Sequence, residues 1–420
     1  MSDLEDWIKH GDEMRRPLLV NPALSKSEEV IIVGAGLSGL SCAFRLSTTR
    51  PDIKIKLIEK SEVLGGVIST WKEGDWICDL AVNAVRPHPA FWRLVRDLNL
   101  DKKFMPTKSG STSRWIIVNG KKHKLGLNSL FKLGPLRFFR SIRKSRIGGA
   151  SVSEVIPNKK IADAFTLGIV NDIADNVDAD FLMPSITKFG KNPPISKRKL
   201  RKKIQDSYPI FTPAKGTLAS IEGGMQTITD ALIQNLESKE NVEIITKSSF
   251  ETPEEVSQRF SVNLESIIWT CSGWQEAFEE TELSIFAVGY KEKCVSQVPK
   301  GYGTLIPDED IPISGILHES DIHHSARCPK GMRLFRLMVP HSRWDTSEES
   351  VKESLMTLLT SNKPILFKKL GVRKIPSFKP GHMSKMQNVL PKCSYLGWSV
   401  SGVSITHVVD EAERVAEIFS

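Results

Sequence analysis

Residues 30–66 constrain this 420-residue chain more than any other stretch. They begin with four β-branched residues, 30–33, which favour a buried parallel strand. A glycine-rich turn, a helix-like run and a second apolar segment, residues 53–58, follow in that order. The order predicts a strand–helix–strand unit whose two strands lie parallel in one sheet.

The turn Gly34-Ala35-Gly36-Leu37-Ser38-Gly39 indicates a dinucleotide site. Gly34 permits the tight turn, Gly36 lets a pyrophosphate approach the backbone, and Gly39 lets the helix pack closely on the sheet. Glu59 follows Gly36 by 23 residues and ends the second strand, where a carboxylate can accept both ribose hydroxyls. Up to this point the dinucleotide can be NAD or FAD, and the glycines alone could serve only helix–sheet packing.

Composition is ordinary for an enzyme of two or three lobes, with 40% hydrophobic and 25% charged residues. No apolar run approaches the ~20 residues of a spanning helix, and the N-terminus lacks the regions of a signal peptide. The six cysteines are scattered, so we expect reduced thiols and no metal site. His323-His324 is the nearest metal candidate, and we interpret this pair as a surface loop.

Alternating and helical patterns predict the elements that follow. We expect a hairpin over 68–79, a helix over 87–100 and a strand over 114–118 ending in an Asn119-Gly120 turn. Several strands between 283 and 340 predict an antiparallel sheet that roofs a substrate cavity. Further helices are expected at 227–236, 347–359 and the C-terminus.

The segment between Asp101 and Glu154 has thirteen Lys or Arg and no acidic residue. Its net charge of +13 therefore exceeds the +9 of the whole chain. Pro135 suits a helix start, and Leu136, Phe139 and Ile142 would share one helix face. A second basic cluster covers 197–203. A basic amphipathic segment is typical of a membrane surface. A merely solvated basic face and nucleic-acid binding are the alternatives, and no nucleic-acid recognition motif accompanies the charge.

The pair Gly65-Gly66 resembles the extended FAD fingerprint of glutathione-reductase-like flavoproteins, especially the amine oxidase, phytoene desaturase and protoporphyrinogen oxidase group. Three further anchors resemble the FAD-dependent protoporphyrinogen oxidase family. They are SIEGGMQTIT at 220–229, GYGTLIP at 301–307 and GVSI at 402–405. The resemblance spans residues 30 to about 418 and implies an α/β fold. That fold combines an FAD-binding Rossmann-like βαβ domain of the glutathione-reductase/amine-oxidase type with an α+β substrate domain.

The resemblance also implies site residues. A porphyrinogen propionate would be held by Arg114, although Arg114 can equally be one more charge in a basic stretch. Backbone N–H groups at 403–405 would face the flavin N1–C2=O edge. No catalytic side chain is implied, since the flavin carries the chemistry. The expected FAD-binding residues are Gly34, Ala35, Gly36, Leu37, Ser38, Gly39, Glu59, Lys60, Gly65, Gly66, Val67, Ala81, Val82, Asn83, Ala84, Met383, Val403, Ser404 and Ile405.

Two departures from the family pattern concern the substrate more than the flavin. Residues 80–83 read Leu-Ala-Val-Asn where the family often has Gly-Pro. Trp398 places a larger side chain at a position that the resemblance puts beside the flavin. The middle domain also looks shorter than usual. We expect an N-terminal extension at 1–28, FAD-binding parts at 29–100, 216–280 and 376–420, a basic membrane-facing and substrate part at 101–215, and a substrate sheet at 281–375.

The family's reaction oxidises protoporphyrinogen IX to protoporphyrin IX in haem biosynthesis, with oxygen or a quinone as acceptor. Coproporphyrinogen III is an alternative substrate, because it carries four propionates and the region near Arg114 is basic. A flavin amine oxidase or desaturase and a non-catalytic flavin or porphyrin carrier are further alternatives. The resemblance implies a cytoplasmic protein, peripheral on the inner face of a membrane, with a possible homodimer and no nucleic-acid partner.

Overall fold

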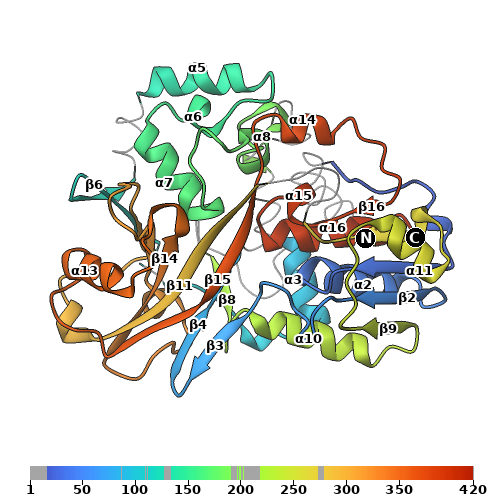
Figure 1. Cartoon of the computed structure of the whole chain (residues 1–420), viewed down its shortest axis with the longest axis horizontal. Helices are drawn as coiled ribbons and strands as arrows, with labels where there is room; N and C mark the ends of the chain where they lie inside the picture. Colours follow the sequence, from blue (N-terminus) through green and yellow to red (C-terminus); the bar gives the residue numbers. More distant parts are fainter. Residues whose placement is uncertain are drawn as a thin grey trace.

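Two β-sheets organise the computed structural model of this chain (Figure 1). The structure describes residues 17–419, apart from 87, 109, 111, 127–133, 191–195, 197, 200–201, 203–217 and 273–278. One sheet is parallel and carries the dinucleotide-type unit. The other is mainly antiparallel and faces it across the molecule.

The parallel sheet has five strands in the order β16-β10-β1-β2-β9. Its central strand β1 (Glu29–Val33) pairs with β2 (Lys54–Ile58) on one side and with β10 (Ile267–Trp269) on the other. The edges are β9 (Val242–Ile245) and β16 (Ser394–Tyr395). The predicted strand–helix–strand unit is therefore confirmed, and sequence-distant strands complete its sheet.

Helices cover both faces of the parallel sheet because its strands are apolar on both sides. One face packs against α2 (Leu37–Thr49), α3 (Pro89–Asp97), α10 (Gln226–Glu237) and α16 (Ile405–Glu417). On the other face, β1 and β10 pack with Val256 of α11 (Pro253–Phe260). Phe91, Leu94 and Val95 of α3 are buried on one face, as their spacing predicts.

The second sheet has seven strands in the order β15-β11-β14-β13-β12-β6-β7. All neighbours are antiparallel except β12 and β6, which run parallel. The bounds are β6 Arg114–Val118, β7 Lys121–Leu125, β11 Glu279–Lys291, β12 Gly303–Leu305, β13 Gly315–Leu317, β14 Met332–Pro340 and β15 Leu366–Ser377. The predicted antiparallel sheet is present, and β15 joins it although the sequence pattern did not indicate a strand there.

The two faces of this sheet have different neighbours. One face packs against α13 (Glu348–Leu358) through Phe286, Phe335 and Leu337. The other face meets the predicted hairpin, β3 (Thr70–Glu73) and β4 (Trp76–Asp79), and a helical layer formed by α6 (Val152–Val155), α7 (Lys159–Val170) and α8 (Ala179–Leu182). This second face therefore looks toward the dinucleotide-type domain.

Short elements complete the described chain. The predicted Asn119-Gly120 turn joins β6 and β7 with positive φ at both residues, as a type I′ turn requires. The remaining strands and helices are β5 Phe104–Pro106, β8 Ala219–Ile221, α5 Pro135–Ser145, α12 Glu319–Ile322, α14 His382–Met386 and α15 Trp398–Ser401. The 3₁₀ turns are Leu24–Lys26, Asp101–Lys103, Lys188–Gly190, Leu264–Ser266, Glu292–Val295 and His341–Arg343.

Helix α5 begins at Pro135 as expected, but its apolar residues divide differently from the prediction. Phe138 and Ile142 pack inward, whereas Leu136 and Phe139 are 77% and 68% exposed.

Most of the second basic cluster, 197–203, lies outside the described residues. All six cysteines are free thiols. Within the described ranges, no helix combines the length and apolar character needed to cross a membrane.

Candidate cofactor-binding site

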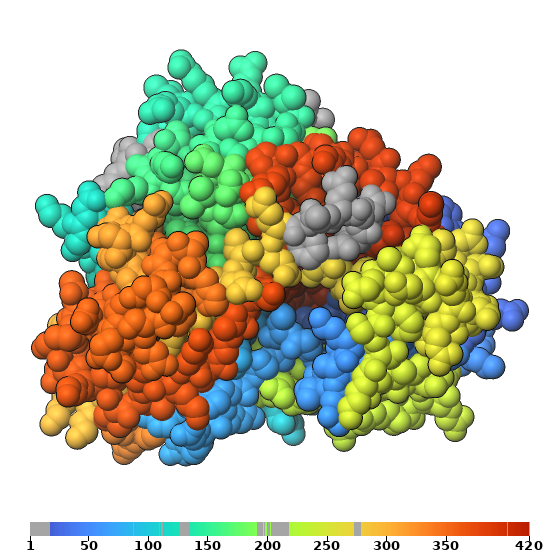
Figure 2. Space-filling view, in the orientation of Figure 1, coloured from blue at the N-terminus to red at the C-terminus, as the bar shows by residue number. Residues whose placement is uncertain are grey.

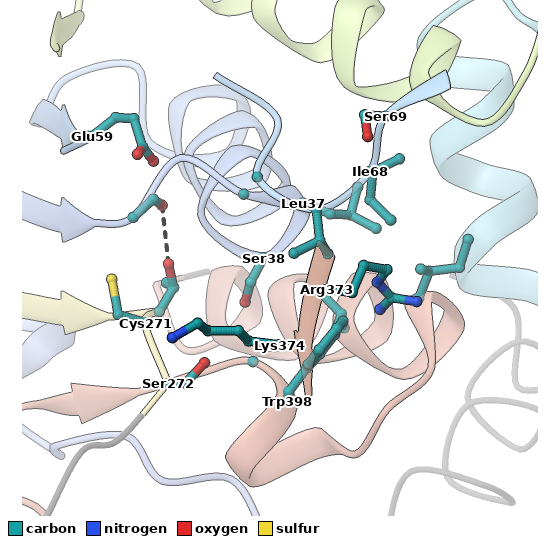
Figure 3. Close-up of a pocket in the computed structure, with 18 of the residues that line it drawn as sticks. Leu37, Ser38, Glu59, Ile68, Ser69, Cys271, Ser272, Arg373, Lys374 and Trp398 are labelled. Carbon is teal, nitrogen blue, oxygen red and sulfur yellow. Dashed lines mark hydrogen bonds between the residues drawn. The ribbon is translucent and has the colours of Figure 1, made fainter. Parts of the chain in front are cut away.

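A cavity of about 510 Å³ opens where the two sheets approach each other. Figure 2 shows the surface hollowed between these halves of the molecule, and Figure 3 shows the lining. On one side it is lined by the turn after β1, the end of β2 and the residues that follow β10. The carboxyl ends of parallel strands are the usual place for a ligand in such sheets.

The β1–α2 turn is shaped for a close ligand. Gly34 has φ +100°, and a Cβ at Gly39 would lie 1.9 Å from the Gly34 carbonyl oxygen, so helix and turn touch directly. The N-cap of α2 is Gly36, and no side chain caps the helix there. Gly36, Leu37 and Ser38 line the cavity, so the free N–H groups and the positive end of the helix dipole favour a phosphate at this wall.

Glu59 is held rigidly at the end of β2. Its Oε2 accepts from the Ala35 N–H at 2.9 Å, and its Oε1 accepts from the Ser61 N–H at 3.0 Å. Glu59 and Lys60 line the cavity, whereas Ala35 is fully buried and donates its N–H to Glu59. A carboxylate fixed this way can accept the hydroxyls of a ribose.

The glycine pair after β2 lies against the first turn. Gly65 donates its N–H to the Ala35 carbonyl at 2.8 Å, and a Cβ on Gly66 would come within 2.9 Å of the Gly36 Cα. Gly66 and Val67 line the cavity. The pair therefore lets two backbone segments form one wall.

At the far end of the cavity, fewer residues line the wall than the sequence predicted. Ile405, the first residue of α16, lines it, and no side chain caps that helix. Met383 is fully buried among Phe181 and Phe378 and does not line it. The remaining predicted residues that do not line this cavity are Ala35, Gly39, Gly65, Ala81, Val82, Asn83, Ala84, Val403, Ser404 and Arg114.

The residues present fit FAD in three respects. Two uncapped N-termini of long helices face one cavity, a glycine wall admits a close ligand, and a fixed carboxylate lies at one end. An elongated dinucleotide could meet all three.

Sequence reasoning missed several lining residues. Thr270, Cys271 and Ser272 follow β10, and the rule that ligands bind at the carboxyl ends of parallel strands could have found them. Arg373 and Lys374 come from β15, whose basic sequence carried no signal of a cavity. Trp398, singled out as a departure, does line the cavity, close to Arg373 (Figure 3).

Arg114 lies outside this cavity, on β6, which is near the opposite edge of the large sheet from β15. Its side chain is exposed, and its guanidinium carbon lies 4.5 Å from the centre of the Tyr302 ring. The Tyr302 hydroxyl donates to Asn83 Oδ1 at 3.2 Å. A stacked arginine therefore connects to the segment 81–84, which was expected to line a flavin.

A buried ionic network underlies this segment. Arg327 pairs with Asp79 at 3.1 Å, and Arg336 lies 3.1 Å from Glu319 while donating to the carbonyls of Asp79 and Ala81. Asp79, Glu319 and His323 could together hold a metal ion, but both carboxylates are already neutralised by arginines. The network fixes the course of the chain after β4.

The interpretation of His323-His324 as a surface loop is wrong for His323. That side chain is fully buried, with Nδ1 2.9 Å from the Ser220 hydroxyl and Nε2 3.1 Å from Glu319. Burial lowers the pKa of His323, and also that of His318. Glu319 lies only four residues before His323, but Ser220 is 103 residues away, so the sequence alone did not show that both ring nitrogens are satisfied in the interior.

These buried histidines predict a pH dependence of stability. A histidine whose folded pKa is lowered contributes stability above its unfolded pKa of about 6.5, and this stability is lost as the pH falls below that value. We expect His323→Gln to lose less stability than wild type between pH 7.5 and 5.5, measured by urea unfolding at each pH. Equal losses in both proteins would contradict a neutral buried His323. His324→Gln is the control, because His324 is exposed.

The comparisons with known proteins agree with this architecture. The domain family described as NAD(P)-binding Rossmann-like matches residues 32–98. Human protoporphyrinogen oxidase is 32% identical over 116 residues, which cover 25% of this chain and 24% of the human protein. The match thus spans about a quarter of that relative's length.

Solved structures extend the likeness to nearly the whole chain. A protein from Exiguobacterium sp. 255-15, assigned as a protoporphyrinogen oxidase, aligns with a TM-score of 0.61 and 16% identity over 93% of this chain and 98% of its own. Cyclohexylamine oxidase from Brevibacterium oxydans IH-35A aligns with a TM-score of 0.62 and 11% identity, at the same coverage. At these identities the likeness establishes the fold.

This chain therefore has the fold that these two solved structures share, built on a Rossmann-like dinucleotide domain. Its sequence relatives, over about a quarter of the chain, include protoporphyrinogen oxidases. The predicted fold class and the resemblance to this family are confirmed.

Proposed function

We propose that this protein is an FAD-dependent oxidoreductase that oxidises protoporphyrinogen IX to protoporphyrin IX, as in haem biosynthesis. The observation that carries the proposal is the cavity, whose one wall has dinucleotide-binding features and whose other wall belongs to the large antiparallel sheet. The local similarity to human protoporphyrinogen oxidase supports the choice of substrate. The domain boundaries expected from the sequence remain part of this proposal.

In this proposal the described residues bind and orient. The N-terminus of α2 would hold the pyrophosphate, and Glu59 the adenosine ribose. The uncapped N-terminus of α16 would stabilise negative charge at the other end of the cofactor. When bound, FAD supplies a two-electron acceptor, and three rounds would remove the six electrons that separate a porphyrinogen from a porphyrin. Oxygen or a quinone would then accept the electrons.

The decisive experiment mixes the FAD-loaded protein with protoporphyrinogen IX without oxygen and follows flavin absorbance and porphyrin fluorescence. Bleaching of the flavin with a parallel rise of porphyrin fluorescence is the expected result. A flavin that stays oxidised with this substrate and with coproporphyrinogen III would contradict the proposal and favour a non-catalytic carrier. Bleaching by an amine alone would favour an amine oxidase.

Coproporphyrinogen III is the second candidate substrate, and the basic hairpin β6–β7 favours it. Lys121 is opposite Val118 and lies on the same face of the hairpin as Arg114. A substrate with four propionates can engage more cations than a substrate with two. The same anaerobic experiment ranks the two substrates by the rate of bleaching.

Arg114 is proposed to hold a propionate, because a planar guanidinium suits a carboxylate. We expect Arg114→Gln to raise KM about tenfold or more, since a charge-assisted hydrogen bond is worth ~1.5–3 kcal/mol, with little change in kcat. Lys124→Gln is the control, because Lys124 is exposed on the neighbouring strand and lies opposite Trp115, on the other face of the hairpin. An unchanged KM in the Arg114 variant would leave Arg114 as one more surface charge.

We also propose that α5 touches the inner face of an anionic membrane. Figure 1 places it at the edge of the molecule, above α6 and α7. Leu136 and Phe139 are exposed on the helix that also carries Arg137, Arg140 and Arg143. Apolar side chains with basic neighbours are typical of interfacial helices. The proposal keeps a peripheral cytoplasmic location and a possible homodimer.

The double variant Leu136→Ser/Phe139→Ser is expected to lose at least about tenfold in affinity for anionic vesicles, since each buried side chain is worth roughly 1.5–3 kcal/mol. Sedimentation with vesicles of mixed zwitterionic and anionic lipid measures this. The control is Leu390→Ser, which removes a side chain that is 92% exposed elsewhere. Unchanged sedimentation of the double variant would show that α5 is only a solvated basic face.

A further inference from the structure

The face of the large sheet that looks toward the dinucleotide-type domain carries three arginines from different strands. Residues directly opposite each other in neighbouring strands share a face. The register links Arg114 to Arg336 through β12 and β13, and Arg336 is opposite Ala287 of β11. Leu283 lies on the same face of β11 as Ala287, and it is opposite Arg373. Arg114, Arg336 and Arg373 therefore point to one side.

Arg336 is already occupied. Its guanidinium lies 3.1 Å from a Glu319 oxygen and donates to two backbone carbonyls after β4. It has a structural role and is not available to a ligand.

Arg373 has no such partners. It lines the cavity, and its Nε is buried without a hydrogen-bond acceptor. The Trp398 ring, centred 5.9 Å from the guanidinium carbon, is a close neighbour. Among the residues that the structure describes, no carboxylate forms an ion pair with it.

The adjacent residue, Lys374, differs from Arg373 because it has a carboxylate partner. Lys374 leaves β15 in the opposite direction (Figure 3), and it forms an ion pair with Glu282 at 3.1 Å. Burial and the nearby Arg336 cation lower the pKa of Arg373 to about 10, which is the direction expected for a cation without a compensating anion. An unpaired cation in a cavity is costly unless a bound ligand supplies the anion.

We propose that Arg373 binds a carboxylate of the substrate and selects acidic substrates. This inference rests on the proposed function and adds a second anion-binding residue to Arg114. Four strands separate β15 from β6, which is about 24 Å at the usual strand spacing. One carboxylate cannot reach both arginines, so Arg373 recognises a different carboxylate from the one at Arg114.

The test measures binding of porphyrins to the full-length, FAD-loaded protein by fluorescence titration. The probes are coproporphyrin III, which has four carboxylates, its tetramethyl ester, and protoporphyrin IX. Arg373→Gln should weaken binding of coproporphyrin III roughly tenfold or more and leave the weaker binding of the ester unchanged. Arg373→Lys should restore part of the affinity, because it keeps the charge without the planar fork.

Lys369→Gln is the matched control. It removes the same charge from the same strand, and Lys369 is exposed on the opposite face, over Trp344. A loss limited to coproporphyrin III would select the tetracarboxylate as substrate, and a loss with protoporphyrin IX as well would extend the role to the dicarboxylate. Both results support the inference.

Three results would overturn it. One is an unchanged affinity of Arg373→Gln for both acids. Another is a fall in the flavin midpoint potential with porphyrin affinity preserved, which would show that Arg373 interacts with the cofactor and not with the substrate. The third is a melting temperature several degrees below wild type without porphyrin, because an unpaired cation contributes no stability to the empty protein. If the wild type binds none of the probes, the proposed function itself fails and the inference falls with it.

Discussion

Replacing Gly39 by alanine is expected to abolish the tight FAD binding that we propose and to destabilise the dinucleotide domain. The added Cβ would lie 1.9 Å from the Gly34 carbonyl oxygen, which is backbone and cannot swing away. Helix α2 must then move off the turn, and its N-terminal N–H groups leave the cavity wall. We expect a loss of about 3 kcal/mol or more, or roughly a hundredfold in affinity.

Calorimetric titration of the apoprotein with FAD measures the affinity, and thermal unfolding measures the stability. Gly126→Ala is the control, because a Cβ there meets nothing within 4 Å. If Gly39→Ala binds FAD as the wild type does, α2 and the turn are less closely packed than the structure indicates.

Replacing Glu319 by alanine is expected to lower the free energy of unfolding by several kcal/mol. Glu319 is fully buried, 3.1 Å from both Arg336 and His323. Burial alone would raise its pKa, but the Arg336 cation and the hydrogen bond from His323 hold that pKa down to about 2. Removing Glu319 leaves the buried Arg336 without its carboxylate, and breaking a buried pair in this way costs about 3–5 kcal/mol.

Urea unfolding at pH 7.5 measures the change in the free energy of unfolding. Glu62→Ala is the control, because Glu62 pairs with Lys247 on the surface and such pairs are worth at most ~1 kcal/mol. Glu319→Gln should fall between the two, since it keeps the volume and one acceptor. A Glu319→Ala variant as stable as the control would show that Arg336 finds other partners.

The sequence by itself determined the dinucleotide unit. Gly34, Gly36, Gly39 and Glu59 are close together along the chain, and local backbone geometry alone demands glycine at the turn. The β3–β4 hairpin and the Asn119-Gly120 turn were predictable for the same reason, since their periodicity and turn chemistry act over a few residues. The fold class followed from these local signals together with the family resemblance.

The tertiary structure decided the positions of charged groups. His323 looked like a surface residue, yet it is buried because Ser220 of β8 and Glu319, four residues earlier in the chain, satisfy both ring nitrogens. Met383 was expected at the flavin, but it packs between Phe181 and Phe378 instead. Arg373 reached the cavity only because β15 joined β11 in one particular register. A shift of one residue would have sent it to the other face, and that register depends on contacts across nearly a hundred residues of chain.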